Sequence, residues 1–210
     1  MKHKLLWEFP GSLETDRLDV RKYEKGDGKA YFALFERNNN REELKEHVDE
    51  ANSVKTEEQA EIRIREHEAE WIARKRLVLG IWLKETRECI GQIWIEPDKW
   101  EVPSFELGYF IDSGYQRRGY ALEASIRSLK FLFEDLQAHK VIIMTHDTNE
   151  RSWKLAERLG FSKEAHFRES RVKDGKRWGM LYYGMLKKEY RTTIKESRIN
   201  AKWIRRFSMN

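Results

Sequence analysis

The sequence predicts a single mixed α/β domain in which a central, mostly antiparallel sheet is flanked by helices. Three observations lead to this fold class. Short apolar runs bounded by turn residues alternate with segments of helical periodicity, as strands and helices do. Two pairs of apolar runs are joined by short polar turns, which indicates antiparallel hairpins. One further pair of runs is separated by a helical segment, which indicates parallel strands with a right-handed crossover.

The first half of the chain predicts one strand, two helical segments and one hairpin. Residues 17–23 form the strand, and residues 29–37 form a helix after a Gly-Asp-Gly break. Residues 42–76 are charge-dense and helical in pattern. Residues 76–84 and 89–97 are two strands joined by a four-residue turn, which makes a hairpin. The helical segment has one thin apolar face, formed by Ala60, Ile64, His67 and Trp71.

The second half continues this alternation of strands and helices. The expected elements are a strand at 104–112, a helix at 118–133, a strand at 140–147, a helix at 150–159 and a hairpin at 165–186. The run at 140–147 is almost continuously apolar, so we expect it to be buried on both faces. Asn149 can cap the helix that follows and Gly160 can end it. No repeat, low-complexity tract or inter-domain linker interrupts the pattern.

Composition and charge limit the classes of function. With 210 residues and 40% hydrophobic content, the chain can bury a real core. The net charge of +5 comes from the tail: eight basic and two acidic residues follow from Lys187 onward, against 33 basic and 34 acidic residues before it. A solvated tail is therefore favoured over a nucleic-acid contact. We also expect no membrane span and no secretory signal. The single cysteine, Cys89, allows no internal disulfide, so a reducing cytoplasm is the expected location.

A short stretch between the strand expected at 104–112 and the helix that follows it fits a phosphate site. It reads Gln116-Arg117-Arg118-Gly119-Tyr120-Ala121. The first N–H groups of a helix are unpaired and carry partial positive charge, so such an end binds phosphate well. Gly119 and Ala121 leave room for a ligand, and the arginines add charge. The stretch is neither a Walker loop nor a dinucleotide fingerprint. On these six residues alone, a solvated turn is an equally good interpretation.

The same six residues resemble the Gln/Arg-x-x-Gly-x-Gly/Ala motif of the GNAT N-acetyltransferases, whose pyrophosphate loop binds acetyl-CoA. Two other stretches resemble the RimJ/RimL branch, the ribosomal-protein N-acetyltransferase type: ETDRLDVRKYEKGD and HDTNERSWKLAERLGFSKEA. The stretch GYFIDSGYQRRGYALEA is similar to a third motif of that branch. The chain departs from the branch at Arg118, where lysine is frequent, and at Ala165, where glycine is usual.

The resemblance implies a GNAT domain at residues 13–187, followed by a basic C-terminal extension at residues 188–210. In this family the fourth and fifth strands, here 105–112 and 140–147, splay apart to hold the pantetheine arm of acetyl-CoA. Asn149 would bind the same arm, and it could also cap its helix. The residues expected to bind acetyl-CoA are Tyr109, Phe110, Ile111, Gln116, Arg117, Arg118, Gly119, Tyr120, Ala121 and Asn149.

The implied reaction is direct transfer of an acetyl group from the thioester to a primary amine. An ammonium cannot attack, so a base must first remove a proton. Glu106 is the first choice for this base, directly or through water, and an exposed or ion-paired strand glutamate is the alternative. Ser152 is the family-based choice for the acid at the departing sulfur, and an ordinary first-turn serine is the alternative. Asp112 is a weaker candidate base, because Asp-Ser-Gly is typical of a turn.

The expected co-substrate is acetyl-CoA, and the acceptor is either a protein N-terminal amine or a small-molecule amine. No metal, nucleic acid or membrane is expected as a partner, and a homodimer is possible because members of the branch are often dimers. A second function stays open: a GNAT-fold protein that binds CoA without turnover, as a sensor or interaction module. A third is a nucleic-acid binder that acts through the basic tail.

Overall fold

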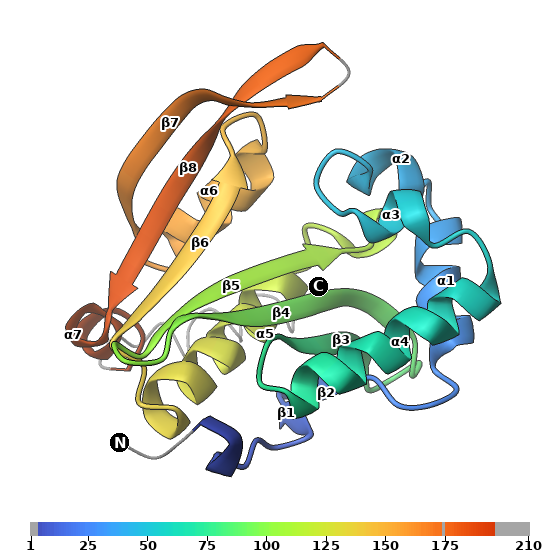
Figure 1. Ribbon diagram of the computed structural model, residues 1–210, viewed down its shortest axis with the longest axis horizontal. Helices are drawn as coiled ribbons and strands as arrows, with labels where there is room; N and C mark the ends of the chain where they lie inside the picture. The colour runs from blue at the N-terminus through green and yellow to red at the C-terminus, as the bar shows by residue number, and fades with distance from the viewer. Residues whose placement is uncertain (1–3, 174, 196–210) are drawn as a thin grey trace. The chain divides into compact units, whose positions relative to one another are not determined.

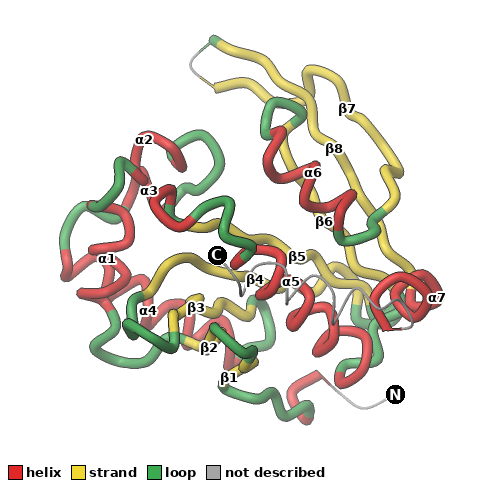
Figure 2. The backbone as a smooth tube through the Cα atoms, turned by 180° about the vertical axis from the view of Figure 1, so that it is seen from behind, coloured by secondary structure: helices red, strands yellow, loops and turns green. Residues whose placement is uncertain are grey.

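A computed structural model of the 210-residue chain describes residues 4–173 and 175–195. Figure 1 labels its elements, and Figure 2 shows helices and strands in separate colours from behind. In chain order they are β1 Ser12–Glu14, β2 Leu18–Lys22, α1 Gly28–Glu36, α2 Asn40–Leu44, α3 Glu50–Ser53, α4 Glu57–Ile72, β3 Leu77–Leu83, β4 Cys89–Lys99, β5 Ser104–Ile111, α5 Tyr120–Lys130, β6 Lys140–His146, α6 Glu150–Arg158, β7 Ser162–Lys173, β8 Lys176–Leu186 and α7 Lys187–Tyr190.

The strands form one mixed sheet of eight strands in the order β1-β2-β3-β4-β5-β6-β8-β7. Only short antiparallel registers join β1 to β2 and β2 to β3, whereas the hairpin of β7 and β8 is long. The pairs β3–β4 and β6–β8 are also antiparallel. β5 and β6 run parallel, with α5 between them in the chain. The predicted fold class, a mixed and mostly antiparallel sheet flanked by helices, is confirmed.

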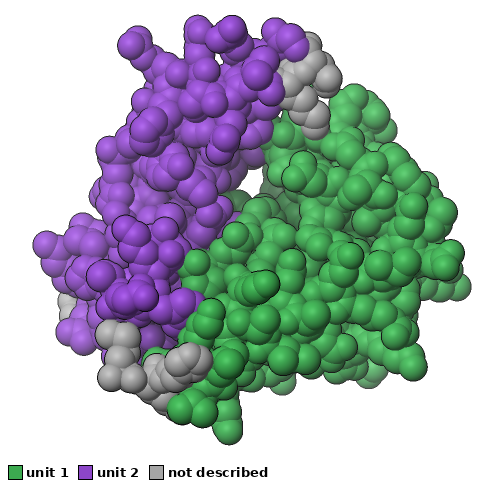
Figure 3. Space-filling view, in the orientation of Figure 1, with its two compact units in different colours: residues 1–97, 109–127 green, residues 98–108, 128–210 purple. Residues whose placement is uncertain are grey.

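The chain divides into two compact units, coloured separately in Figure 3. The first unit comprises residues 1–97 and 109–127, and the second unit comprises residues 98–108 and 128–210. The division falls within β5 and within α5, so each of these elements contributes residues to both units. Each unit is described by itself below.

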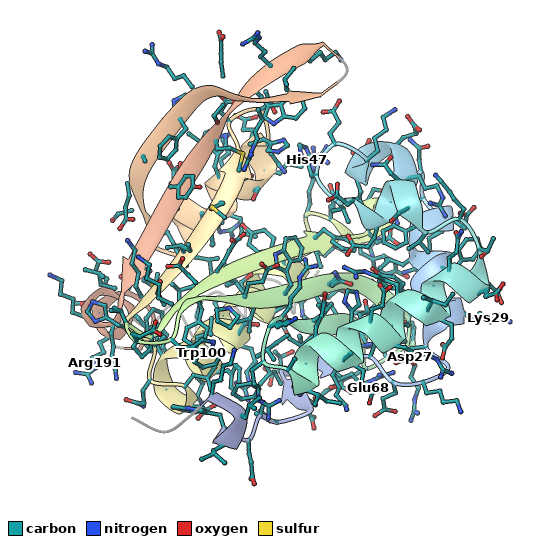
Figure 4. The ribbon with its side chains drawn as sticks, viewed as in Figure 1. Asp27, Lys29, His47, Glu68, Trp100 and Arg191 are labelled. Carbon is teal, nitrogen blue, oxygen red and sulfur yellow. The ribbon has the colours of Figure 1, made fainter. Side chains whose placement is uncertain are left out.

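The core of the first unit lies between α1–α4 and the strands β3 and β4. α1 contacts α4, and α4 contacts β3. The helices approach closely at Gly28, where an added Cβ would lie 2.8 Å from the Glu61 backbone. The predicted apolar face of α4 is confirmed, because Ala60, Ile64, His67 and Trp71 are its buried residues. Ahead of α1, Asp27 (labelled in Figure 4) pairs with Arg21 at 2.7 Å.

Two buried titratable groups belong to this core. His67 lies beside Tyr23 and Tyr31, with ring centroids 6.4 and 6.2 Å away. Burial, followed by the positive charge of Arg63, lowers the pKa of His67 to about 3, so the ring is neutral. Burial raises the pKa of Cys89 to about 11, and its Sγ lies 3.7 Å from the Tyr23 hydroxyl. Cys89 is thus a protonated thiol buried in the core.

The second unit is built on β6, β8 and β7. α6 packs against β6 and β8, and alternate residues of β6 are buried: Val141, Ile143 and Thr145. α7 is fixed by Tyr190, which stacks on Phe133 with centroids 4.7 Å apart and donates a 2.9 Å hydrogen bond to Glu134. Trp100, labelled in Figure 4, packs edge-on against Phe105 at 5.5 Å.

Three sequence-based expectations differ from the structure. Residues 42–76 are not one helix: the chain breaks after Leu44 and again after Ser53, and α4 begins where Thr56 caps it by accepting from the Gln59 N–H. The helix expected at 118–133 ends at Lys130 and continues as a π-helical turn. β6 is buried on one face rather than two, because its even-numbered residues are half-exposed. The short strand β1 was not expected.

The structure describes only the first part of the predicted basic extension. Residues 188–195 are described and contain the end of α7 and a π-helical turn. The remaining part of the predicted extension, 196–210, lies outside the described residues. Within the described part of the chain, no helix is both long enough and apolar enough to cross a membrane.

Candidate functional site

The end of β5 places Tyr109, Phe110 and Ile111 in the first unit. Tyr109 is half-buried, whereas Phe110 and Ile111 are buried, and the Phe110 ring lies 6.0 Å from that of Phe35 in the core. At Gly91 an added Cβ would lie only 2.4 Å from the Phe110 carbonyl oxygen. The side chains of Phe110 and Ile111 are therefore occupied in packing, and the Phe110 carbonyl lies against Gly91, so a ligand could meet this segment only at backbone groups that do not face Gly91.

Asp112, directly after β5, is fully buried and holds the following turn. It forms an ion pair with Arg37, and its other oxygen accepts hydrogen bonds from the Asn38 amide at 2.8 Å and the Gly114 N–H at 2.9 Å. A buried carboxylate with this many donors is a structural anchor. The turn expected at Asp-Ser-Gly is confirmed, and these contacts favour a structural role for Asp112 over that of a base.

The loop that links this turn to α5 has two residues in the left-handed region. Arg117 has φ 62° and Gly119 has φ 82°. Glycine adopts this conformation without a steric cost, whereas for arginine it is a strained one. Gln116 folds back and donates from Nε2 to the Ile111 carbonyl at 3.3 Å. Arg117 and Arg118 are exposed, and the Arg118 guanidinium lies 5.4 Å from the Tyr115 ring. Two cations thus flank the start of a helix.

The N-terminus of α5 begins at a glycine. The Gly119 carbonyl accepts the first helical hydrogen bond, from the Glu123 N–H at 3.0 Å, and the helix itself starts at Tyr120. Gly119 has no side chain with which to cap the first turn. The N–H groups that precede Glu123 have no acceptor within the helix. This end of α5 is therefore suited to an anion.

Glu123 fixes the start of α5 to the segment before β2. It accepts hydrogen bonds from the Thr15 hydroxyl at 2.6 Å and from Arg17 Nε at 2.7 Å. Arg17 also donates to the Arg118 carbonyl at 3.2 Å and lies over the Tyr120 ring at 4.5 Å. Sequence reasoning missed this clamp. The three residues do lie in motifs that resemble the family, Thr15 and Arg17 in one and Glu123 in another. Their contact could not be predicted from the motifs, because Arg17 and Glu123 are 106 positions apart.

In the second unit, Glu106 is half-buried on β5 opposite Ile142 of β6. The parallel register of these strands comprises three pairs, the last of which joins Glu106 to Ile142. β6 continues to His146, and there its register is with β8. Beyond Glu106, the parallel register of β5 and β6 has no further pair within the described residues. The resemblance to GNAT enzymes predicts that the two strands diverge after this point.

The start of α6 carries Asn149 and Ser152. The Asn149 side-chain oxygen accepts from the Ser152 N–H at 3.2 Å, so the predicted cap of this helix is confirmed. Both residues are half-buried. Because the cap uses Oδ1 of Asn149, its Nδ2 group keeps two donors that can face a ligand. Gly160, with φ 90°, follows the helix, as expected for a terminating glycine.

The predicted site residues therefore fall into two groups. Tyr109–Ile111 and Gln116–Ala121 belong to the first unit, and Glu106, Asn149 and Ser152 belong to the second unit. Among the described residues, no group of three or more histidine, cysteine, aspartate or glutamate side chains could hold a metal ion.

Comparisons with known proteins identify the family. Residues 17–162 match the acetyltransferase (GNAT) domain family, which is more than half of the chain. The chain is 25% identical over 179 residues to the uncharacterized N-acetyltransferase YnaD of Bacillus subtilis (85% of this chain, 98% of that protein). It is 27% identical over 175 residues to the uncharacterized N-acetyltransferase YoaA of the same organism (83% and 96%).

Solved structures share the fold. The ribosomal L7/L12 α-N-protein acetyltransferase RimL, solved with coenzyme A, superposes with a TM-score of 0.76 at 15% identity (83% of this chain, 97% of that chain). The ribosomal-protein-S5-alanine acetyltransferase of Vibrio fischeri gives 0.73 at 20% identity (85% and 98%). Together with the family match over residues 17–162, these findings place the chain among the GNAT acetyltransferases, enzymes that take their acetyl group from acetyl-CoA.

Proposed function

We propose that this protein transfers the acetyl group of acetyl-CoA to a primary amine by direct attack of the amine on the thioester. The observation that carries the proposal is the start of α5, where a glycine-initiated helix end and two exposed arginines lie in the motif at which the family binds pyrophosphate. Such an end provides N–H donors and positive potential without a competing side-chain cap. Gln116, Arg117, Arg118, Gly119, Tyr120 and Ala121 would hold the diphosphate.

The rest of the coenzyme would be recognised by backbone and amide groups. Since the side chains of Phe110 and Ile111 pack in the core, the strand segment from Tyr109 to Ile111 would pair with the pantetheine arm through its main chain, as an added strand does. Asn149 would donate from Nδ2 to the same arm while Oδ1 remains the helix cap. Both roles are compatible with the contacts that these residues already make.

Chemistry at the reacting end requires a proton acceptor and stabilisation of charge. Acetyl-CoA supplies a thioester whose carbonyl carbon is open to an amine. Glu106 would take the proton of the ammonium, directly or through water. Backbone N–H groups of the β5 end would stabilise the oxyanion. Ser152 would hydrogen-bond the departing sulfur, whose thiol is acidic enough, with a pKa of about 8.5 by analogy with cysteine, to leave with little help.

The acceptor is proposed at the level of chemical class. It is a primary amine, either the N-terminal amine of a protein or that of a small molecule. A protein acceptor is supported by names among the relatives: a 31% identical segment of 85 residues, 40% of this chain, matches the putative ribosomal N-acetyltransferase YdaF of Bacillus subtilis. The comparison with RimL points the same way.

Three further proposals concern the molecule as a whole. The acetyltransferase domain would span residues 13–187, with residues 188–210 as a basic extension. The protein would act in the cytoplasm and could form a homodimer, as the resemblance to RimJ/RimL enzymes suggests. Light scattering of the purified protein at two concentrations measures the oligomeric state directly.

A thiol-release assay tests the activity. The protein is mixed with acetyl-CoA and a panel of amines, which includes peptides with free N-termini, the same peptides N-acetylated as controls, and small primary amines. We expect thiol release that depends on a free amine and that decreases in Glu106→Gln and Ser152→Ala. If calorimetry shows CoA binding but no amine in a broad panel gives release, the non-catalytic CoA-binding function replaces this one.

A further inference from the structure

Asp147 lies in the turn between β6 and α6 and contacts both strands of the neighbouring hairpin, β7 and β8. Its backbone N–H donates to the Gly179 carbonyl on β8 at 3.0 Å. Its carboxylate Oδ2 lies 3.0 Å from Nε2 of His166 on β7. The next residues, Thr148 and Asn149, lead into α6. Asp147 therefore connects the segment that carries Asn149 and Ser152 to two strands, and His166 is its side-chain partner.

Asp147 and His166 meet across a strand because Gly179 lies between them. β8 is paired with β6 on one side and with β7 on the other, so the two side chains approach from opposite neighbours. A Cβ added at Gly179 would lie 2.5 Å from Asp147 Oδ2 and 2.6 Å from His166 Nε2. Any side chain there would occupy the space in which the pair forms. The pairing thus depends on three residues from separate parts of the chain.

The lowered pKa of Asp147 indicates that its carboxylate is ionised in this pair. Burial alone would raise the pKa of Asp147. The hydrogen bond with His166 and the backbone hydrogen bond with Gly179 lower it by more than burial raises it, so the net shift of the pKa is downward. The second oxygen, Oδ1, is buried and has no hydrogen-bond partner among the described residues. The Asp147 side chain as a whole is part-exposed, and His166 is the side chain that holds its Oδ2 oxygen. Without the imidazole, Asp147 would have no side-chain partner to hold its orientation.

We propose that Asp147 and His166 form a positioning pair, which sets the start of α6 so that Asn149 and Ser152 meet the pantetheine arm and the sulfur of acetyl-CoA. This inference rests on the proposed function and deepens it. The pair acts through Asn149 and Ser152 and does not itself contact the reacting atoms. A displacement of about 1 Å of groups that bind or orient a substrate is enough to reduce turnover substantially.

The test uses the full chain and two readouts, the Kd for CoA by calorimetry and kcat for acetyl transfer. His166→Ala removes the partner of Asp147, and we expect CoA binding to weaken about tenfold, as the loss of one ligand hydrogen bond does, with a comparable or larger decrease in kcat. His166→Gln keeps a side-chain N–H that can donate to Asp147 and should recover most of both losses. His139→Ala, an exposed histidine of the same unit, is the matched control and should behave like the wild type.

Gly179→Ala is a second test, in which neither Asp147 nor His166 is itself substituted. Its methyl group should push Asp147 and His166 apart and reproduce the loss seen in His166→Ala. Thermal unfolding of each variant confirms that it folds. Wild-type CoA affinity and kcat in His166→Ala, or equal losses in the alanine and glutamine variants, would overturn the positioning role alone. A wild-type protein that neither binds CoA nor releases thiol would overturn the proposed function, and with it this inference.

Discussion

The N-termini of the four longest helices differ in how they are completed. Thr56 caps α4, Asn149 caps α6, and the Glu61 carboxylate accepts from the Gly26 and Gly28 N–H groups at the start of α1, at 3.1 and 3.2 Å. α5 begins instead at Gly119, which brings no side chain. A side-chain cap satisfies the N–H groups that a bound anion would otherwise use. The comparison therefore separates three helix starts that receive a side-chain acceptor from one that is preceded by a glycine.

α5 and α6 make the contrast sharpest, because both belong to the proposed site. α5 is held in place through Glu123, which accepts hydrogen bonds from Thr15 and Arg17. The start of α6 is capped by the side chain of its own N-cap residue, Asn149. We infer that α5 provides the binding end for the diphosphate and that α6, with Glu106, provides the reacting end. Variants at the two ends should then have different kinetic signatures.

The largest effect is expected at the reacting end. Glu106→Gln removes the proposed base, and kcat should fall by about 10²- to 10⁴-fold, the usual contribution of a general base. The Kd for CoA should stay close to that of the wild type, because Glu106 is not proposed to bind the coenzyme. Steady-state kinetics and calorimetry measure the two quantities, and Glu101→Gln, an exposed glutamate of the same unit, is the control. Unchanged kcat in Glu106→Gln would remove this residue from the mechanism.

A binding defect is the expected signature at the start of α5. Gly119→Ala forces a side chain into a backbone with φ 82° and brings a methyl group to the diphosphate. We expect a roughly 10- to 100-fold increase in the Kd for CoA from this strain and crowding, while kcat at saturation is largely kept.

The matched control for this variant is Gly175→Ala. Gly175 has φ 74° and open space around it, so alanine there undergoes similar backbone strain at a position that is not proposed to bind the coenzyme. Its CoA affinity should equal that of the wild type. If both alanine variants bind CoA with wild-type affinity, the open start of α5 is not where the diphosphate binds.

The smallest effect concerns the double role of Asn149. Asn149→Asp keeps an oxygen that caps α6 but loses the amide donor, so the protein should retain its stability and bind CoA a few-fold more weakly. Asn149→Ala loses both and should also lower the free energy of unfolding by about 1 kcal/mol. Chemical denaturation and calorimetry together separate the two roles. Equal CoA affinity in Asn149→Asp and the wild type would leave Asn149 as a cap only.

Local patterns were enough to predict most elements of the fold. The β3–β4 and β7–β8 hairpins, the α4 face and the Asn149 cap follow from periodicity, turn residues and capping preferences, which act over a few residues. The breaks between α2, α3 and α4 were missed, since charge-dense segments look helical throughout. The one-sided burial of β6 depends on which layers cover the sheet, and an apolar run does not reveal this.

The candidate site was predictable only where a short motif carries it. Gln116–Ala121 and Asn149 could be located because their chemistry is local. The hydrogen bonds of Thr15 and Arg17 to Glu123, and those of Arg37 and Asn38 to Asp112, join residues more than 70 positions apart. Such contacts depend on the folded topology, so residue type and spacing alone did not single them out. Phe110 and Ile111 were expected to meet the coenzyme through backbone groups, and the burial of their side chains is compatible with that expectation.

The neutral imidazole at the centre of the first unit makes the protein sensitive to acid. In the unfolded chain His67 takes up a proton near pH 6.5, but in the folded protein it does so only near pH 3. Between these values the unfolded state binds more protons, so the free energy of unfolding decreases as the pH falls, by up to about 1.4 kcal/mol per pH unit. A His67→Gln variant, which cannot be protonated, should lose this part of the slope in denaturation curves recorded from pH 7 to pH 4. Mild acidification would then lower the free energy of unfolding before ordinary carboxylates begin to take up protons.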